Sequence, residues 1–186
     1  MRRISAIIFC YLAMSTAGCA TPRAGTPLAQ DIRADDSLGR LKYQRKIVER
    51  RICSNDDAFH LLIQYANGED SCASYGERVS WLKSRQMLPD GFDRPADEAI
   101  TRGTLAVGIA RILNIKGGIV MHVLPRSERY VTRELVYRGV YPPGSSPQQT
   151  YSGLEVIGVL AKMEDLQNGD PSNLPASKMG ETEAQQ

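Results

Sequence analysis

Two histidines and four cysteines are the residues of this 186-residue chain whose side chains most often take part in catalysis or bind metals. His60 lies inside one apolar segment and His122 follows another, and no pattern in the sequence brings the two together. The chain has no G-x-S-x-G, H-E-x-x-H, P-loop or dinucleotide-binding motif. We therefore expect a protein that is not an enzyme, that uses no cofactor or metal, and whose histidines have structural roles.

The N-terminus has the features of an export signal. A basic start precedes an apolar run, residues 4–14, that is too short to span a bilayer. The sequence STAGCA at 15–20 resembles a bacterial lipobox, with Thr where that motif usually has Leu. We expect residues 1–18 to be a lipoprotein signal peptide and Cys19 to be acylated, and the alternative is ordinary cleavage after Ala20.

Acylation of Cys19 would anchor an exported protein to a membrane of the bacterial cell envelope, facing the periplasm or the cell surface. Residues 19–36 have no periodic apolar pattern and are expected to form a flexible tether. Residues 167–186 are polar and are expected to be a disordered tail. The folded domain is thus expected over 37–166. Because the net charge is only +2, nucleic acid is not an expected partner.

The expected mature domain keeps two cysteines, Cys53 and Cys72, on either side of the apolar stretch 58–66. In an oxidising compartment two cysteines most simply form a disulfide. It would clamp that helix at both ends and stabilise the domain by about 3 kcal/mol. The alternative, a metal site built on the cysteines, would need His60 and His122 as further ligands.

Apolar spacing and capping residues predict an all-α domain. Ser54, Thr101 and Ser152 are expected to be helix N-caps, the last within a full S-x-x-E capping box. The short apolar run 119–121 fits either a helix or a strand. Helices are expected over 37–51, from Ser54 to about 67, over 75–86, from Thr101 to about 115, over 127–137 and over 152–165.

Two segments of the domain resemble each other at a period of about fifty residues. Residues 82–89 parallel 135–142, and the helix start 101–104 parallels 152–155. Each unit reads as a helix, a loop rich in Pro and Gly, and a capped helix. Neither unit could bury its apolar face alone, so the two are expected to pack together.

The first unit resembles the S-layer homology domain. Repeats of that family run as a helix with a spaced Leu and Gly, a loop with G-x-F-x-P, and a helix start I-T-R-A-E. Residues 91–95 (GFDRP) and 100–102 (ITR) are similar to that run, with the Phe–Pro spacing off by one and Thr104 in place of the Glu. This repeat would cover about residues 76–114.

The second unit, about residues 128–166, keeps other parts of the same pattern. Leu135 and Gly139 match the first helix, and Glu155 matches the Glu of the helix start, whereas Gly153 replaces its Arg. Domains of the family usually carry three repeats in a pseudo-threefold bundle. Residues 38–67 would supply a degenerate third repeat, because Ser54 precedes Thr101 by nearly the distance that separates Thr101 from Ser152.

The resemblance implies a non-catalytic envelope protein that binds a cell-wall or surface polysaccharide. The family's helix-start Arg lines grooves that grip anionic polysaccharide, and Arg102 is the residue that matches it. Trp81 is a second candidate, as a platform on which a sugar could stack. The alternatives are a solvated Arg102 and a core Trp81. At the level of function, the alternative is a structural or protein-interaction module of the envelope that does not bind glycans.

One segment has a charge pattern of its own. The helix expected over 38–51 could lie against anionic lipid or polymer close to the anchor, or it could simply be solvated. Its six basic residues are Arg40, Lys42, Arg45, Lys46, Arg50 and Arg51.

Overall fold

The computed structural model describes residues 21–30, 37–89, 91–115 and 127–169. The expected signal peptide with Cys19, the run 119–121, His122 and nearly all of the expected tail lie outside the described residues.

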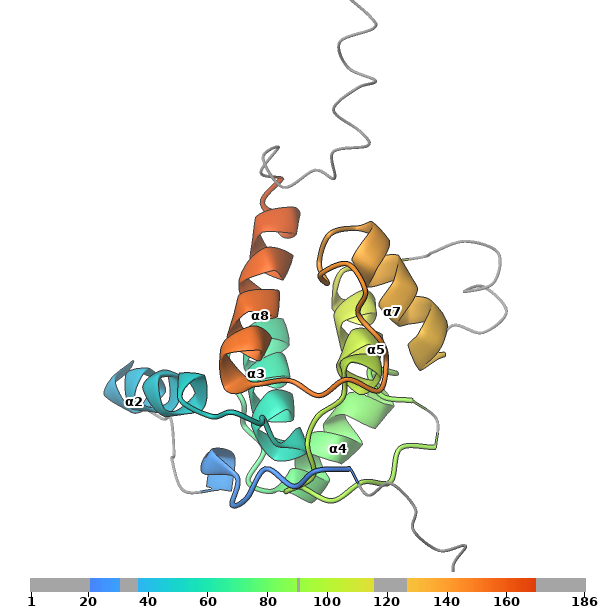
Figure 1. Cartoon of the computed structure of the whole chain (residues 1–186). Coiled ribbons are helices and arrows are strands. Elements are labelled where there is room, and N and C mark those ends of the chain that lie inside the picture. The colour runs from blue at the N-terminus through green and yellow to red at the C-terminus, as the bar shows by residue number, and fades with distance from the viewer. Residues whose placement is uncertain (1–20, 31–36, 90, 116–126, 170–186) are drawn as a thin grey trace, which may run out of the picture.

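The fold is all-α, as predicted (Figure 1). The described residues contain no β-strand, one short 3-10 helix and six α-helices. The 3-10 helix is η1 (Leu28–Gln30), and the α-helices are α2 (Ser37–Val48), α3 (Asn55–Asn67), α4 (Tyr75–Ser84), α5 (Arg102–Ile112), α7 (Glu128–Tyr137) and α8 (Gly153–Gln167). None of the helices in these described ranges is long and apolar enough to cross a bilayer.

The three predicted N-caps start α3, α5 and α8. The side chains of Ser54 and Thr101 accept hydrogen bonds from the backbone amides three residues later. Ser152 forms the full capping box with Glu155. Helix α2 ends three residues earlier than expected because the chain turns after Val48, and this turn directs the Arg50 carbonyl to the amide of Gly153 at the start of α8 (2.9 Å).

Residues just before the three caps join in a ring of backbone hydrogen bonds. Cys53 donates to the carbonyl of Tyr151 (2.7 Å), Tyr151 donates to that of Ile100 (3.2 Å), and Ile100 donates to that of Cys53 (3.0 Å). Three helix starts that are 47 and 51 residues apart in sequence therefore meet at one point.

The helices also pack in a cyclic order. Helix α3 packs against α4, α5 packs against α7, and α8 packs against α2. Each helix that starts at the ring thus lies against the helix that follows it in the chain, and α8 closes the cycle on the first helix of the domain (Figure 1).

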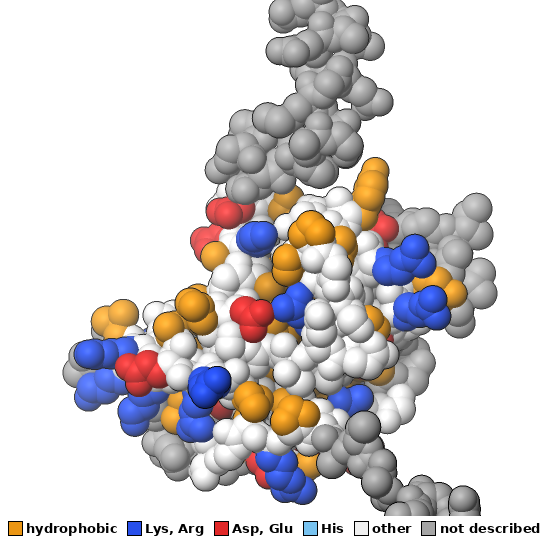
Figure 2. Space-filling view, viewed as in Figure 1, with side chains coloured by type: hydrophobic (Ala, Val, Ile, Leu, Met, Phe, Trp, Pro, Cys, Tyr) orange, Lys and Arg blue, Asp and Glu red, His pale blue; other side chains and the backbone are white. Residues whose placement is uncertain are grey.

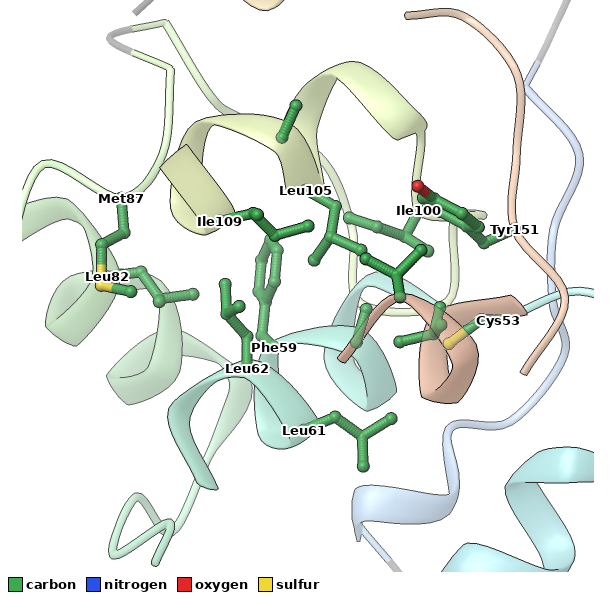
Figure 3. Close-up of a cluster of buried hydrophobic side chains, with 14 of the residues drawn as sticks. Cys53, Phe59, Leu61, Leu62, Leu82, Met87, Ile100, Leu105, Ile109 and Tyr151 are labelled. Atoms are coloured by element: carbon green, nitrogen blue, oxygen red, sulfur yellow. The ribbon is translucent and has the colours of Figure 1, made fainter. Parts of the chain in front are cut away.

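The core lies between the helices that start at the ring (Figure 3). Leu105 and Ile109 extend from α5 toward Phe59 and Leu62 of α3, and all four side chains are at most 1% exposed. The close approach of the two helices requires Gly108, because a Cβ there would overlap the Leu62 side chain. Burial of such side chains is the main favourable term in the stability of the domain.

The expected disulfide is wrong, because Cys53 and Cys72 are both free. Cys53 is fully buried at the ring, where its amide bonds Tyr151. Cys72 lies in the loop after α3, where its carbonyl accepts a hydrogen bond from Arg78 of α4. The two thiols therefore lie beside different neighbouring helices. Although the cysteines precede and follow α3 in the sequence, the fold does not bring them together.

Part of the expected tether is packed against the domain. Ala24 donates to the carbonyl of Asp97 (2.8 Å), Ala99 donates to that of Pro22 (2.9 Å), and Leu28 is 8% exposed. Residues 21–30 therefore belong to the folded body, because the loop before α5 offers them backbone partners and the core covers Leu28.

Candidate functional site

Arg102, the expected polysaccharide ligand, is the first residue of α5 and its side chain is only 11% exposed. Its Nη2 donates to Oε1 of Glu155 on α8 (2.9 Å), and its Nη1 donates to the hydroxyl of Ser145 (2.5 Å). The guanidinium carbon lies 5.0 Å from the centre of the Tyr151 ring. Arg102 is thus engaged inside the protein, where it joins the starts of α5 and α8.

The carboxylate of Glu155 is stabilised by this arrangement. Burial alone would raise its pKa, but the amide and hydroxyl of Ser152 and the guanidinium of Arg102 together lower it below the usual value. The ion pair and the capping box share one carboxylate, so Arg102 supports the helix start that the capping box forms.

Trp81, the other candidate, lies half-buried near the end of α4. The guanidinium carbon of Arg85 lies 3.7 Å from the centre of its ring, in a cation–π contact. The indole packs partly against the core and partly faces solvent, so both expected roles, core residue and platform, are compatible with its position.

Trp81 borders a groove where several helices end, which we name the helix-end groove. The ends of α3, α4, α5 and α8 contribute to its walls. Two arginines and no acidic residue are among its lining residues, which are Tyr65, Ala66, Asn67, Trp81, Ser84, Arg85, Met87, Arg111, Ile112 and Gln167.

The polar side chains of the helix-end groove differ in how strongly they are hydrogen-bonded to other described residues. Tyr65 donates its hydroxyl hydrogen to Gln167 (2.8 Å), which links the ends of α3 and α8. Arg85 has only long contacts, to the Trp81 carbonyl (3.5 Å) and the Ser84 hydroxyl (3.4 Å). The guanidinium of Arg111 is exposed, and no hydrogen bond or ion pair joins it to another described residue. Both arginines can therefore bind an anion without breaking a strong contact.

A second, shallow depression shares Trp81, Ser84 and Arg85 with the helix-end groove. Its lining includes Cys72, Glu77 and several serines. Burial is the largest of the effects that raise the pKa of the Cys72 thiol to about 11, so this cysteine is a poor nucleophile at neutral pH.

The two candidate ligand residues are not in one site. Arg102 starts α5, whereas the helix-end groove meets α5 at Arg111, nine residues later. Nine residues of helix correspond to roughly 13 Å, so Arg102 and the helix-end groove lie at opposite ends of α5.

A buried polar cluster was not predicted. Arg78 donates to Asp56 (2.8 Å) and to Asp70 (2.5 Å), and the same Asp70 oxygen lies 2.6 Å from Nδ1 of His60. Asp70 lies in the turn after α3, and no pattern in the sequence relates it to partners eight and ten residues away. His60 is buried and hydrogen-bonded, in agreement with the structural role expected of it.

The cluster has the character of a stabilising network. Burial alone would raise the pKa of Asp70, but the hydrogen bonds of His60 and Arg78 outweigh it and lower the pKa to about 2. The side chains of His60, Asp70 and Arg78 are at most 7% exposed, so the network does not open to solvent. Within the described ranges, no group of three or more His, Cys, Asp or Glu side chains is placed to hold a metal ion.

No known family model, curated protein or solved structure matches this chain.

Proposed function

We propose that this protein is a non-catalytic, lipid-anchored protein of the bacterial cell envelope that binds an anionic cell-wall or surface polysaccharide in the helix-end groove. The observation that carries the proposal is the lining of that groove. It combines one partly exposed indole with two arginines and no carboxylate. Acylated Cys19 would hold the protein at the membrane while the domain engages the polymer.

The architecture supports a relation to S-layer homology repeats. Three helix starts meet in a ring, and the helices pack in a cycle, as a pseudo-threefold bundle of three repeats would. Gln86 and Gly139, which correspond in the two aligned units, both adopt positive φ, at 59° and 75°. The ring includes Cys53, directly before α3, and this favours residues 38–67 as the degenerate third repeat.

The chemistry of the groove suits a charged sugar polymer. A guanidinium offers donors in a planar fork that matches a carboxylate or a phosphate. The indole of Trp81, one face of which Arg85 covers, offers the rest of its exposed apolar surface to a sugar ring. The amide of Asn67 adds a hydrogen-bonding group to the same wall. The site therefore has donors for anionic groups and a surface for the ring that carries them.

The internal contacts of Arg102 favour a second candidate function. If the residue that matches the family's ligand-binding Arg serves only to join α5 and α8, the domain has kept the fold without glycan binding. The protein would then be a structural or protein-interaction module of the envelope.

Co-sedimentation separates the two functions. A chain beginning at residue 20, which retains every described core residue from Leu28 to Leu166, is mixed with insoluble cell-wall polysaccharide before and after reduction of its acidic groups. We expect saturable binding that is lost after reduction. We also expect the double variant Arg85→Gln/Arg111→Gln to bind at least tenfold more weakly, since charge-assisted hydrogen bonds contribute about 1.5–3 kcal/mol each.

Lys83→Gln is the matched control, because this exposed residue of α4 carries the same charge and does not line the groove. It should bind as the unmodified chain does. Absence of binding by the folded chain, or equal binding by the double variant, would contradict the polysaccharide proposal and favour the interaction module.

A further inference from the structure

Helix α2 has two opposite faces of different character. Tyr43 and Ile47 lie four residues apart, are at most 1% exposed and pack into the core. Leu41 and Val48 lie seven residues apart, two turns of helix, and are 63% and 40% exposed. The inner face anchors the helix to the domain, and the outer face presents aliphatic side chains to solvent.

Exposed cationic side chains flank these two aliphatic residues, and Arg45 is the nearest of them on the helix surface. Glu49 is the one acidic residue among the described positions 37–51. No ion pair joins any of the exposed cations to another described residue. These exposed cations are Arg40, Lys42, Arg45, Lys46 and Arg51.

Arg50 is engaged differently, because its guanidinium donates to the carbonyls of Ala24 and Thr26. Figure 2 shows basic and hydrophobic side chains gathered over α2 at one corner of the molecule. The corner is therefore a cationic surface with an apolar centre, built on a helix that the core holds in place.

We propose that the outer face of α2 binds the surface of an anionic phospholipid bilayer. Lys and Arg side chains are attracted to anionic headgroups, and aliphatic side chains between them enter the boundary between headgroups and acyl chains. A hydrophilic polyanion would use the cations alone and would leave Leu41 and Val48 exposed. The pairing of both kinds of side chain on one face is what favours lipid.

This surface is separate from the helix-end groove, whose lining residues come from helices other than α2. The domain can therefore hold a polysaccharide and lie on a membrane at the same time. Neither contact depends on the other, and membrane binding by α2 does not require the acyl chain on Cys19.

The test is co-sedimentation of the unlipidated chain from residue 20 with phosphatidylcholine vesicles and with equimolar phosphatidylcholine and phosphatidylglycerol vesicles. We expect binding to the anionic vesicles that weakens with added salt. Lys42→Gln/Arg45→Gln should lower the partition coefficient on the order of twentyfold, since each cation near the surface contributes about fivefold. Leu41→Ser/Val48→Ser should lower it about tenfold.

Two controls test whether exposed cations or exposed apolar side chains elsewhere on the protein also contribute to vesicle binding. Lys83→Gln/Arg133→Gln removes two exposed cations elsewhere, and Tyr137→Ser removes an aromatic side chain that is 66% exposed. Both should bind vesicles as the unmodified chain does, and so should Trp81→Ala, a variant of the groove. Circular dichroism establishes that every variant is folded.

Three results would overturn the proposal. Equal binding to neutral and anionic vesicles, or no binding to either, would remove the basis for an anionic membrane. If Leu41→Ser/Val48→Ser bound anionic vesicles unchanged, the apolar centre would have no role, and the surface would be a site for a soluble polyanion.

Discussion

Asp70 lies in the turn after α3, yet its side chain is completely buried and accepts hydrogen bonds from His60 and Arg78. The sequence identified His60 as structural but gave no sign of its partner. Residue type and local spacing predict caps, which act within one helical turn. They do not predict pairs that form only when α4 packs against α3.

The lowered pKa of Asp70 makes a stability prediction with a defined sign. An Asp pKa of about 2 in the folded state, against about 3.9 when unfolded, corresponds to roughly 2–3 kcal/mol. This contribution is complete above about pH 5 and is lost as the pH falls to about 2. Asp70→Asn should therefore be less stable than the unmodified chain near neutral pH, and the difference should shrink over that interval in urea unfolding.

Glu69→Gln provides the matched control, since Glu69 is the exposed neighbour in the same turn. Its stability should follow that of the unmodified chain at every pH. A difference between Asp70→Asn and the unmodified chain that stayed constant with pH would contradict the role given to the Asp70 carboxylate.

Arg102 shows why a matched motif position does not by itself identify a ligand contact. The residue type and position agree with the family pattern, but Nη1 and Nη2 donate to Ser145 and Glu155 inside the protein. We expect Arg102→Ala to lower the free energy of unfolding by about 2 kcal/mol, because it removes charge-assisted bonds from a nearly buried guanidinium.

Arg138→Ala is the matched control, because it removes an Arg–Glu ion pair that is exposed. Arg138 contacts Glu134, four residues earlier in the sequence. It should cost less than about 0.5 kcal/mol in the same denaturation experiment. If Arg102→Ala were as stable as the unmodified chain but failed to bind polysaccharide, Arg102 would be a ligand contact after all.

At the scale of elements, all six described helices could be predicted. Their apolar spacing repeats over at least two turns, and four of them begin at Ser or Thr side chains that accept a backbone amide hydrogen bond. The disulfide could not be predicted correctly. Two cysteines on either side of a helix say nothing about which neighbouring helix each one faces.

Gly153 at the start of α8 gives the sharpest test of the close packing around the ring. A Cβ there would overlap the backbone carbonyl of Ile47, which cannot move without displacing α2. Gly153→Ala should therefore cost roughly 2 kcal/mol or more in thermal or denaturant unfolding.

Gly158 lies within the same helix, and a Cβ there would meet nothing within 4 Å. Gly158→Ala should stabilise the protein by about 0.5–1 kcal/mol, because alanine has the higher helix propensity. If both substitutions changed the free energy of unfolding in the same direction, the packing of α8 against α2 would differ from that described.

At the scale of the whole molecule, the helix-end groove combines residues from segments that are as much as 102 positions apart, such as Tyr65 and Gln167. Trp81 was identified from its type alone, but Arg85 and Arg111 were not identified as its neighbours. Their proximity depends on how the helices are arranged around the ring, and helix periodicity does not contain that information.

The distribution of charge over the described fold could not be predicted from the net charge either. A net charge of +2 predicts no strong electrostatic field around the protein. The described fold nevertheless concentrates cations on the outer face of α2 and in the helix-end groove, because buried partners such as Asp56 and Asp70 are turned inward. The two surfaces can therefore bind anions although the protein as a whole is nearly neutral.

Binding of a polysaccharide beside Trp81 can be followed directly, because Trp81 is the single tryptophan of the chain. The measurement is a titration of intrinsic tryptophan fluorescence with soluble fragments of the acidic cell-wall polysaccharide. We expect a saturable change in emission that needs at least tenfold more ligand in Arg85→Gln/Arg111→Gln and is unaltered in Lys83→Gln. An emission spectrum that does not change while the fragments bind the folded protein would place the ligand elsewhere and contradict the account.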